Sequence, residues 1–207
     1  MLYNESVLEK FMQAKKGNVK QKIKKSAKQL FFTMPYKDVS MRDVAAKSDM
    51  TVGNIYRYYE NKEILFDDIV KKCHDEINLI TKINNYAQSF TKTNVVINKK
   101  KVYKNSRFKT FILDMILKFI TNNAEELYIL INSSEGSKYE NIHDKLIEII
   151  KSTIMDTVEG TDEKRALTYA KMALSNISIL LKDYVGDKKS LQAELKAFLG
   201  NFFEIFK

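Results

Sequence analysis

The sequence contains few of the residues that interrupt regular structure. Its 207 residues include a single proline, Pro35, and six glycines. Because β-rich folds need frequent turns, which glycine and proline supply, this scarcity predicts an all-α fold. There is also a single cysteine, Cys73, which excludes an intrachain disulfide. That fits a reducing cytoplasm, although a secreted protein without disulfides would have the same composition.

Long apolar runs are also missing. The first 16 residues lack the uninterrupted apolar core of a signal peptide, because Glu5, Glu9 and Lys10 break it. No apolar run approaches the roughly 20 residues needed to cross a bilayer. We therefore expect a cytoplasmic protein with no membrane partner.

Motifs for catalysis and metal binding are absent from the sequence. There is no HExxH, no GxGxxG and no GxxxxGK[ST], and Cys73 and His74 are adjacent rather than at a chelating spacing. His74 and His143 stand alone, so we expect hydrogen-bonded, partly exposed histidines. The sequence predicts no enzyme, no cofactor and no metal site.

Positive charge is unevenly distributed along the chain. Residues 15–62 hold 12 Lys and Arg against 4 Asp and Glu, whereas residues 114–207 hold 12 against 15. This asymmetry favours a nucleic-acid-binding N-terminal part joined to a non-binding body. A lysine-rich proteome would explain the number of lysines but less well their segregation. The basic residues of 99–109 are interpreted as a solvated loop face, or more weakly as an extra phosphate contact or a site that attracts an acidic effector.

Residues 40–62 carry the strongest local signal. Ser40 and Asp43 have the spacing of a capping box, which predicts a short helix starting at Ser40. Ser48-Asp49-Met50 would form a turn, Thr51 would cap a second short helix, and Asn61 would cap a longer one. The order predicts a helix-turn-helix, with three short core helices as the alternative. A basic helix at 19–33 would precede it, separated by Gly17 from a short helix or arm at 1–16.

The rest of the chain has helical periodicity. The expected helices are 62–83, 106–121, 124–132, 140–158, 161–185 and 190–206, with a loop at 132–140. We interpret residues 84–104 as a partial helix or mobile segment. The domain boundary is placed near residue 80.

Over about residues 19 to 70 the sequence resembles the TetR family of bacterial transcriptional regulators. The matching residues are Ile23, Ala27, Leu30-Phe31, Val39, Met41, Asp43-Val44-Ala45, Thr51, Gly53, Ile55-Tyr56, Tyr59, Asn61-Lys62-Glu63 and Leu65. The chain departs from the family pattern at Asp49, where glycine is usual, and at Pro35-Tyr36, where Gly-Tyr is common. Aspartate tolerates the left-handed conformation, so we expect the turn to persist.

The resemblance implies a domain plan and a function. Residues 1–80 would be a DNA-binding domain with its helix-turn-helix at about 40–62 and an N-terminal extension at 1–18. Residues 81–207 would be a helical effector-binding and dimerisation domain. The chain would regulate transcription, most often as a repressor released from a palindromic double-stranded operator by a small-molecule effector. Rival interpretations are a non-regulatory interaction protein that binds nucleic acid non-specifically, and an enzyme within the helical body.

The resemblance also implies roles for individual residues. Thr51, Val52, Gly53 and Asn54 would face bases, with Gly53 permitting close approach. The residues expected at phosphates are Ser40, Arg42, Tyr56, Tyr58 and Lys62, with Arg57 at a phosphate or a base. Lys20 and Lys24 would add backbone contacts, whereas Tyr59 would be part of the core.

Two further surfaces are expected in the C-terminal half. The last two helices would form a four-helix bundle with a second copy, with an intrachain hairpin as a nearly equal alternative. The expected dimer residues are Ala166, Ala170, Ala173, Ile177, Leu181, Leu195, Phe198 and Phe202. By resemblance, an effector pocket would be lined by Phe108, Phe111, Met115, Phe119, Tyr128, Tyr139 and His143, although aromatics at helical spacing are more often core.

Overall fold

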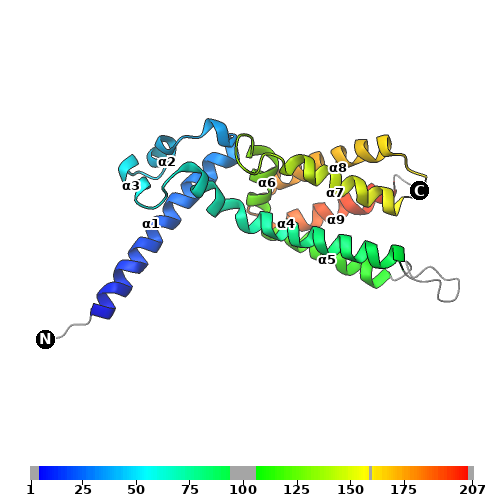
Figure 1. The fold of residues 1–207 in the computed structure, drawn as a ribbon, viewed down its shortest axis with the longest axis horizontal. Helices are drawn as coiled ribbons and strands as arrows, with labels where there is room; N and C mark the ends of the chain where they lie inside the picture. Colours follow the sequence, from blue (N-terminus) through cyan, green and yellow to red (C-terminus); the bar gives the residue numbers. More distant parts are fainter. Residues whose placement is uncertain (1–4, 94–105, 159, 205–207) are drawn as a thin grey trace. The chain divides into compact units, whose positions relative to one another are not determined.

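The computed structural model describes residues 5–93, 106–158 and 160–204, and the regular elements in these ranges are all helical (Figure 1). The predicted all-α fold is confirmed. In chain order the elements are α1 (Glu5–Thr33), the 3-10 helix η1 (Tyr36–Asp38), α2 (Met41–Lys47), α3 (Val52–Tyr56), α4 (Lys62–Thr93), α5 (Ser106–Asn122), α6 (Ala124–Ser133), α7 (Ile142–Thr157), α8 (Glu163–Asp183) and α9 (Lys188–Glu204). Within the described ranges, no helix is both long and apolar enough to span a membrane.

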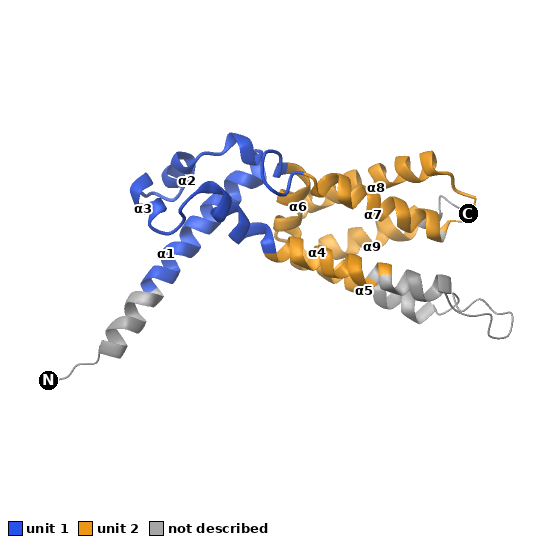
Figure 2. Cartoon of the chain, in the orientation of Figure 1, with its two compact units in different colours: residues 1–71, 133–140 blue, residues 72–132, 141–207 orange. Residues whose placement is uncertain are grey.

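The chain divides into two compact units (Figure 2). Unit 1 comprises residues 1–71 and 133–140, and unit 2 comprises residues 72–132 and 141–207. The division falls inside α4, whereas the sequence pattern placed a boundary near residue 80. Segment 133–140 belongs to unit 1 although it follows α6 in the chain.

The three predicted helix caps in unit 1 are confirmed. Ser40 donates its backbone N–H to the Asp43 carboxylate at 2.8 Å, and Asp43 donates its own to the Ser40 hydroxyl at 3.2 Å. The Thr51 hydroxyl accepts the backbone N–H three residues later at 3.3 Å, and the Asn61 side chain does the same at 2.9 Å. These bonds satisfy backbone donors that would otherwise lack partners at the helix starts.

The turn between α2 and α3 adopts the expected backbone. Asp49 has a φ of 54°, the left-handed conformation that glycine adopts most easily. Aspartate tolerates this region better than most side chains. The presence of aspartate where the family usually has glycine therefore leaves the helix-turn-helix intact.

The expected break at Gly17 is wrong. Helix α1 runs without interruption from Glu5 to Thr33. One glycine in a helix interior costs only about 1 kcal/mol relative to alanine, and the Lys and Gln residues around it are good helix formers. The helix does end before Pro35, as predicted.

Two other helix boundaries differ from the sequence expectation, one by several turns and one by a single residue. Helix α4 extends ten residues beyond Ile83 to Thr93, while residues 94–104 of the segment expected to be irregular lie outside the described residues. Helix α8 is capped by Asp162 rather than by Thr161, since the Asp162 carboxylate accepts a backbone N–H at 2.8 Å. Aspartate is the stronger of the two capping residues.

Unit 2 is built from packed helices with apolar interiors. Helix α8 packs on both α7 and α9, and α5 packs on α9. On α8 the buried side chains are mostly small, whereas Ile154 on α7 and Leu191 and Leu195 on α9 contribute larger ones. Small residues along one face allow neighbouring helices to approach closely, and the larger side chains fill the space between them.

Candidate nucleic-acid interface

Helix α3 presents its N-terminal residues to solvent. Thr51 and Gly53 are exposed, and Val52 and Asn54 are half-buried. Ile55 is fully buried and anchors the helix from beneath. A Cβ added to Gly53 would meet no other atom within 4 Å, so the space over this position is open. The four residues expected to face bases thus share one accessible end of a short, anchored helix.

The expected phosphate-contacting residues lie at the start of α2, at the end of α3 and between α3 and α4. Ser40 and Arg42, at the start of α2, are exposed, as is Arg57 after α3. Tyr56 is 50% exposed, although a large aromatic side chain of this kind is usually mostly buried. Tyr58 is half-buried. Their phosphate-binding role stays a prediction that these exposures permit.

Lys62 differs from the other expected phosphate ligands. Its ammonium donates a hydrogen bond to the Tyr36 carbonyl at 2.7 Å and lies 4.1 Å from the centre of the Tyr36 ring. Burial lowers the pKa of Lys62, and the nearby Asp38 carboxylate partly offsets that effect. Lys62 therefore ties the start of α4 to η1, and a phosphate would have to share its ammonium with the Tyr36 carbonyl.

Asp68, on α4, links Tyr59, which follows α3, to two lysines of α1. It accepts a hydrogen bond from the buried Tyr59 hydroxyl at 2.7 Å, and its carboxylate lies 3.5 Å from the Lys20 ammonium and 3.4 Å from that of Lys24. Lys24 also donates to the Asp68 backbone carbonyl. Tyr59 is part of the core, as predicted, and the two lysines have an intramolecular partner that sequence reasoning missed.

The pKa of Asp68 lies below its ordinary value. Burial opposes ionisation, but the Tyr59 hydrogen bond and the charges of Lys24 and Lys20 outweigh it. Because the folded-state pKa is lowered, the stability contributed by Asp68 is present above its ordinary pKa of 3.8 and is lost as the pH falls through the lower folded value.

Replacing Asp68 with asparagine is expected to lower the free energy of unfolding by about 1 kcal/mol at neutral pH, since a charged acceptor for Tyr59 is lost. The difference in unfolding free energy between wild type and variant should narrow as the pH falls from 3.8 through the lower folded-state pKa of Asp68, because the wild-type carboxylate then also becomes neutral. Urea unfolding across this pH range measures both effects. Asp183→Asn, at an exposed position on α8, is the matched control. A gap that stays constant with pH would contradict this account.

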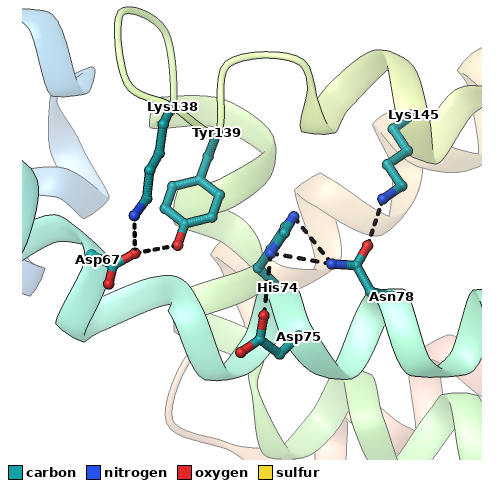
Figure 3. A network of polar contacts seen from close by, with 7 residues as sticks. All are labelled: Asp67, His74, Asp75, Asn78, Lys138, Tyr139 and Lys145. Carbon is teal, nitrogen blue, oxygen red and sulfur yellow. Dashed lines mark hydrogen bonds and ion pairs between the residues drawn. The ribbon is translucent and has the colours of Figure 1, made fainter.

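Segment 133–140 is held in unit 1 by α4 (Figure 3). The Asp67 carboxylate lies 2.6 Å from the Lys138 ammonium and accepts a hydrogen bond from the Tyr139 hydroxyl. A second ion pair joins Lys37 to Glu135 at 2.7 Å. Burial opposes ionisation of Asp67, but the bonds from Lys138 and Tyr139 prevail and hold its pKa below the ordinary value. The segment is therefore anchored by two ion pairs and a buried tyrosine.

The Tyr139 ring extends an aromatic cluster in unit 1. Its centre is 6.1 Å from that of Phe66, which packs edge-on against Phe31 at 4.8 Å and Tyr36 at 4.9 Å. Tyr139 was expected to line an effector pocket, but the structure places it in this cluster, because its chain segment folds onto α4. In the sequence, the glycine and serines of segment 133–140 indicated a loop, and nothing in the pattern indicated that the loop packs on α4.

Unit 2 contains a half-open cavity of about 470 Å³. It is lined by Ile131, Asn132, His143, Asp144, Ile147, Lys171, Leu174, Ser175 and Ser178. Of the expected pocket residues whose side chains the structure describes, only His143 lines it. Met115, Phe119 and Tyr128 are half-buried but do not line it, and the side chains of Phe108 and Phe111 lie outside the described residues.

The other histidine, His74, also lies in unit 2 (Figure 3). Its ring contacts the Asn78 amide at 3.3 Å, and Asp75 lies 3.6 Å away. Lys145 on α7 donates in turn to the Asn78 side chain. His74 is therefore a hydrogen-bonded, partly buried histidine, as expected. Among the described residues, no group of three or more His, Cys, Asp or Glu is placed to hold a metal ion.

Most of the expected dimer residues are covered by their own chain. The buried ones are Ala166, Ala170, Ala173, Leu181, Leu195 and Phe202, whereas Ile177 and Phe198 are half-buried. Their burial follows from the packing of α7, α8 and α9. The large apolar side chains that α8 leaves exposed are Met172 at 55% and Ile179 at 54%. A dimer surface on α8 would include these two, which sequence periodicity did not single out.

Comparison with known proteins identifies the helix-turn-helix segment. Residues 23–69, from α1 into α4, match the family model described as bacterial regulatory proteins, tetR family. A solved transcriptional regulator (TerR/AcrR family) from Aquifex aeolicus VF5 is 18% identical, with 88% of this chain and 98% of that chain covered and a TM-score of 0.48. NalD, the secondary repressor of the MexAB-OprM multidrug efflux pump in Pseudomonas aeruginosa, is 14% identical, with 91% and 95% covered and a TM-score of 0.49. No curated protein sequence matches the chain.

Proposed function

We propose that the chain is a sequence-specific DNA-binding regulator of transcription, as the match of residues 23–69 to the family model of the tetR bacterial regulatory proteins supports. The observation that carries this proposal is the accessible N-terminal end of α3, anchored by the buried Ile55 and open over Gly53. A short helix of this kind can enter the major groove with its first residues against base edges. The role is regulatory rather than catalytic.

Specificity and affinity would come from different residues. Asn54 can form paired hydrogen bonds with an adenine, and Gly53 allows the helix backbone to approach the bases. Tyr56, Arg57 and Arg42 would bind phosphates and fix the helix in register. Because the base-facing residues carry no charge, most of the affinity would come from the phosphate contacts.

The proposed active form is a homodimer on a palindromic operator. One copy of α3 reads only a few base pairs, and two copies at a fixed spacing read both halves of a palindrome. The exposed Met172 and Ile179 on α8 support a surface for a second copy. Symmetric contact of that face with itself would bury both side chains.

Repression relieved by a small-molecule effector is the proposed regulatory mode. The unit 2 cavity supports it, because its lining joins the apolar Ile147 and Leu174 to several polar side chains. Asn132 and His143 of this lining stand just before and just after segment 133–140 in the chain. An effector that prefers one conformation of these helix ends would shift the population of the segment, and through Asp67 that of α4.

Selection of bound duplexes from a random DNA pool tests the proposed function. We expect the full-length protein to enrich a palindrome whose half-sites are one helical turn apart, as two α3 helices in adjacent major grooves require. Retention of DNA with a steep salt dependence but no enriched sequence would instead indicate non-specific nucleic-acid binding. That outcome would overturn the regulator proposal.

Operator binding is expected to slow amide hydrogen exchange in segment 133–140 by about threefold or more. If the segment couples the cavity to α4, DNA binding must in turn alter the stability of the segment, because coupling between sites is reciprocal. The double variant Lys138→Gln, Tyr139→Phe removes both donors to Asp67 and should abolish this response. Lys145→Gln, which removes a bond to Asn78 within unit 2, is the control. Equal protection in the wild type and the double variant would rule out this route.

A further inference from the structure

The unit 2 cavity has an apolar floor to which three helices contribute. Ile131 on α6, Ile147 on α7 and Leu174 on α8 line it, and their exposed fractions are 7%, 6% and 3%. All three are branched aliphatic residues, and none of the described lining residues is Phe, Tyr or Trp. A planar aromatic ligand therefore finds no ring to stack on, whereas an alkyl chain can cover the floor. The volume of about 470 Å³ lies within the range of sites that hold small molecules.

The polar rim of the cavity carries hydrogen-bond donors. Asn132 and Ser178 already bond to each other, since the Ser178 hydroxyl donates to the Asn132 side-chain oxygen at 3.0 Å. The Asn132 amide donates one N–H to the Tyr128 carbonyl at 2.9 Å, which leaves its second N–H. The Ser175 hydroxyl and the Lys171 ammonium are further donors at the rim. A ligand head group that accepts hydrogen bonds therefore suits this rim.

The charges around the cavity favour an anion over a cation. Lys171 forms no ion pair with any residue that the structure describes. Asp144 is the acidic residue of the lining, but its side chain is 88% exposed and lies 3.5 Å from the His143 ring. Water and salt screen so exposed a carboxylate. Lys171 is exposed too, but its long, flexible side chain can turn its ammonium onto a bound group. The head group that fits best is therefore negatively charged.

We propose that the unit 2 cavity binds an aliphatic carboxylate of medium chain length. The alkyl chain lies on Ile131, Ile147 and Leu174, and the carboxylate accepts hydrogen bonds from Lys171 and Ser175. Burial of the chain supplies most of the affinity, because each CH2 group removed from water strengthens binding about fourfold. The rim selects the charge of the head group. This inference deepens the proposed function and rests on it only in making the carboxylate the effector.

Calorimetric titration of the full-length protein, without DNA, tests the head group. The probes are octanoate, octanol and octylamine, which share one alkyl chain and carry an anion, a neutral hydroxyl and a cation. We expect octanoate to bind about tenfold more tightly than the other two, since hydrogen bonds between charged groups are the stronger ones. No saturable binding of octanoate, or equal or tighter binding of octanol or octylamine, would overturn the inference.

Two further carboxylates test the aliphatic floor. Decanoate adds two CH2 groups to octanoate and should bind about tenfold more tightly, because the longer chain buries more apolar surface. Naphthoate is an aromatic carboxylate and should bind more weakly than octanoate, because no aromatic ring lines the described cavity. Tighter binding of naphthoate than of octanoate would contradict an aliphatic ligand.

Paired variants test whether the carboxylate binds in this cavity. Lys171→Gln should weaken octanoate binding by about tenfold, whereas Lys182→Gln, at an exposed α8 position outside the lining, should leave it unchanged. Ile147→Val removes one methyl group from the floor and should weaken binding about threefold. Ile154→Val makes the same change at a buried α7 position outside the lining and is the matched control. Octanoate affinity that neither cavity variant changes would place the ligand elsewhere and overturn the inference.

Measurements with the operator separate this inference from the proposed function. Because the titrations contain no DNA, they report on the cavity even if the protein enriches no palindrome. If a palindrome is enriched but neither octanoate nor decanoate binds, the inference fails and the proposed function stands. Octanoate binding that also weakens operator affinity by about tenfold or more supports both. Octanoate binding with unchanged operator affinity supports the cavity site and contradicts its role as the effector site.

Discussion

Replacing Tyr56 with alanine is expected to weaken operator binding by about 100-fold or more while leaving the protein folded. Tyr56 is 50% exposed, so its removal should change the free energy of unfolding by no more than about 0.5 kcal/mol. A hydrogen bond to a charged group contributes about 1.5 to 3 kcal/mol, and a dimer would lose two of them. Fluorescence anisotropy with the selected operator measures the affinity, and urea unfolding measures the stability.

Two control variants sharpen the assignment of Tyr56. Tyr56→Phe keeps the ring and removes the hydroxyl, so a loss close to that of the alanine variant would identify the hydroxyl as the phosphate contact. Leu79→Ala removes a similarly exposed apolar side chain, 57% exposed, from the unit 2 part of α4 and should bind the operator normally. Undiminished specific binding by the Tyr56→Ala, Lys62→Ala double variant would show that the site is wrongly assigned.

Lys62 is a less specific probe of DNA binding than Tyr56, because its replacement also affects stability. Lys62→Ala should also abolish operator binding, but it removes the 2.7 Å bond to the Tyr36 carbonyl as well. That loss should lower the free energy of unfolding by about 1 kcal/mol. Because of this contact, only the tyrosine variant isolates DNA binding from stability.

Replacing Gly53 with leucine is expected to abolish operator binding without destabilising the protein. Apart from its chain neighbours and the backbone of its own helix, nothing lies within 4 Å of the position that a Cβ would take, so a side chain can start from this position without a clash in the free protein. Removing a helical glycine can even raise the free energy of unfolding, by up to about 1 kcal/mol. On the operator the new side chain would occupy the space between the α3 backbone and the bases. We expect a loss of 100-fold or more in affinity, on the order of 3 kcal/mol.

Gly200 provides the matched control for Gly53. It lies on α9 in unit 2 and is likewise open, since a Cβ there meets nothing within 4 Å. Gly200→Leu should therefore reproduce the gain in helix propensity without affecting DNA binding. Gly53→Ala should give a smaller loss than leucine. Normal operator affinity of Gly53→Leu would mean that this face of α3 does not approach the bases.

The sequence by itself determined the local architecture of unit 1. The caps at Ser40, Thr51 and Asn61 join side chains to backbone groups three residues away, so their spacing is visible in the chain. The left-handed turn at Asp49 and the helix end before Pro35 are likewise properties of single residues and their neighbours. Scarce glycine and proline and regular apolar spacing were sufficient for the all-α fold. The base-facing role of the start of α3, in contrast, came from the resemblance to the TetR family and stays a prediction.

Only the tertiary structure decided which side chains meet across the chain. The Lys62 bond to Tyr36 spans 26 residues, and the Tyr139 bond to Asp67 spans 72. No periodicity encodes such pairs, because they depend on how whole helices and loops pack. For the same reason the apolar stripe of α8 correctly predicted which face is buried, but not whether that face packs within the chain or against a second copy. Six of the eight expected dimer residues are buried within one chain. The pattern of segment 133–140 indicated only a loop. Its attachment to unit 1 could not be predicted, because its partner Asp67 becomes a neighbour only on folding.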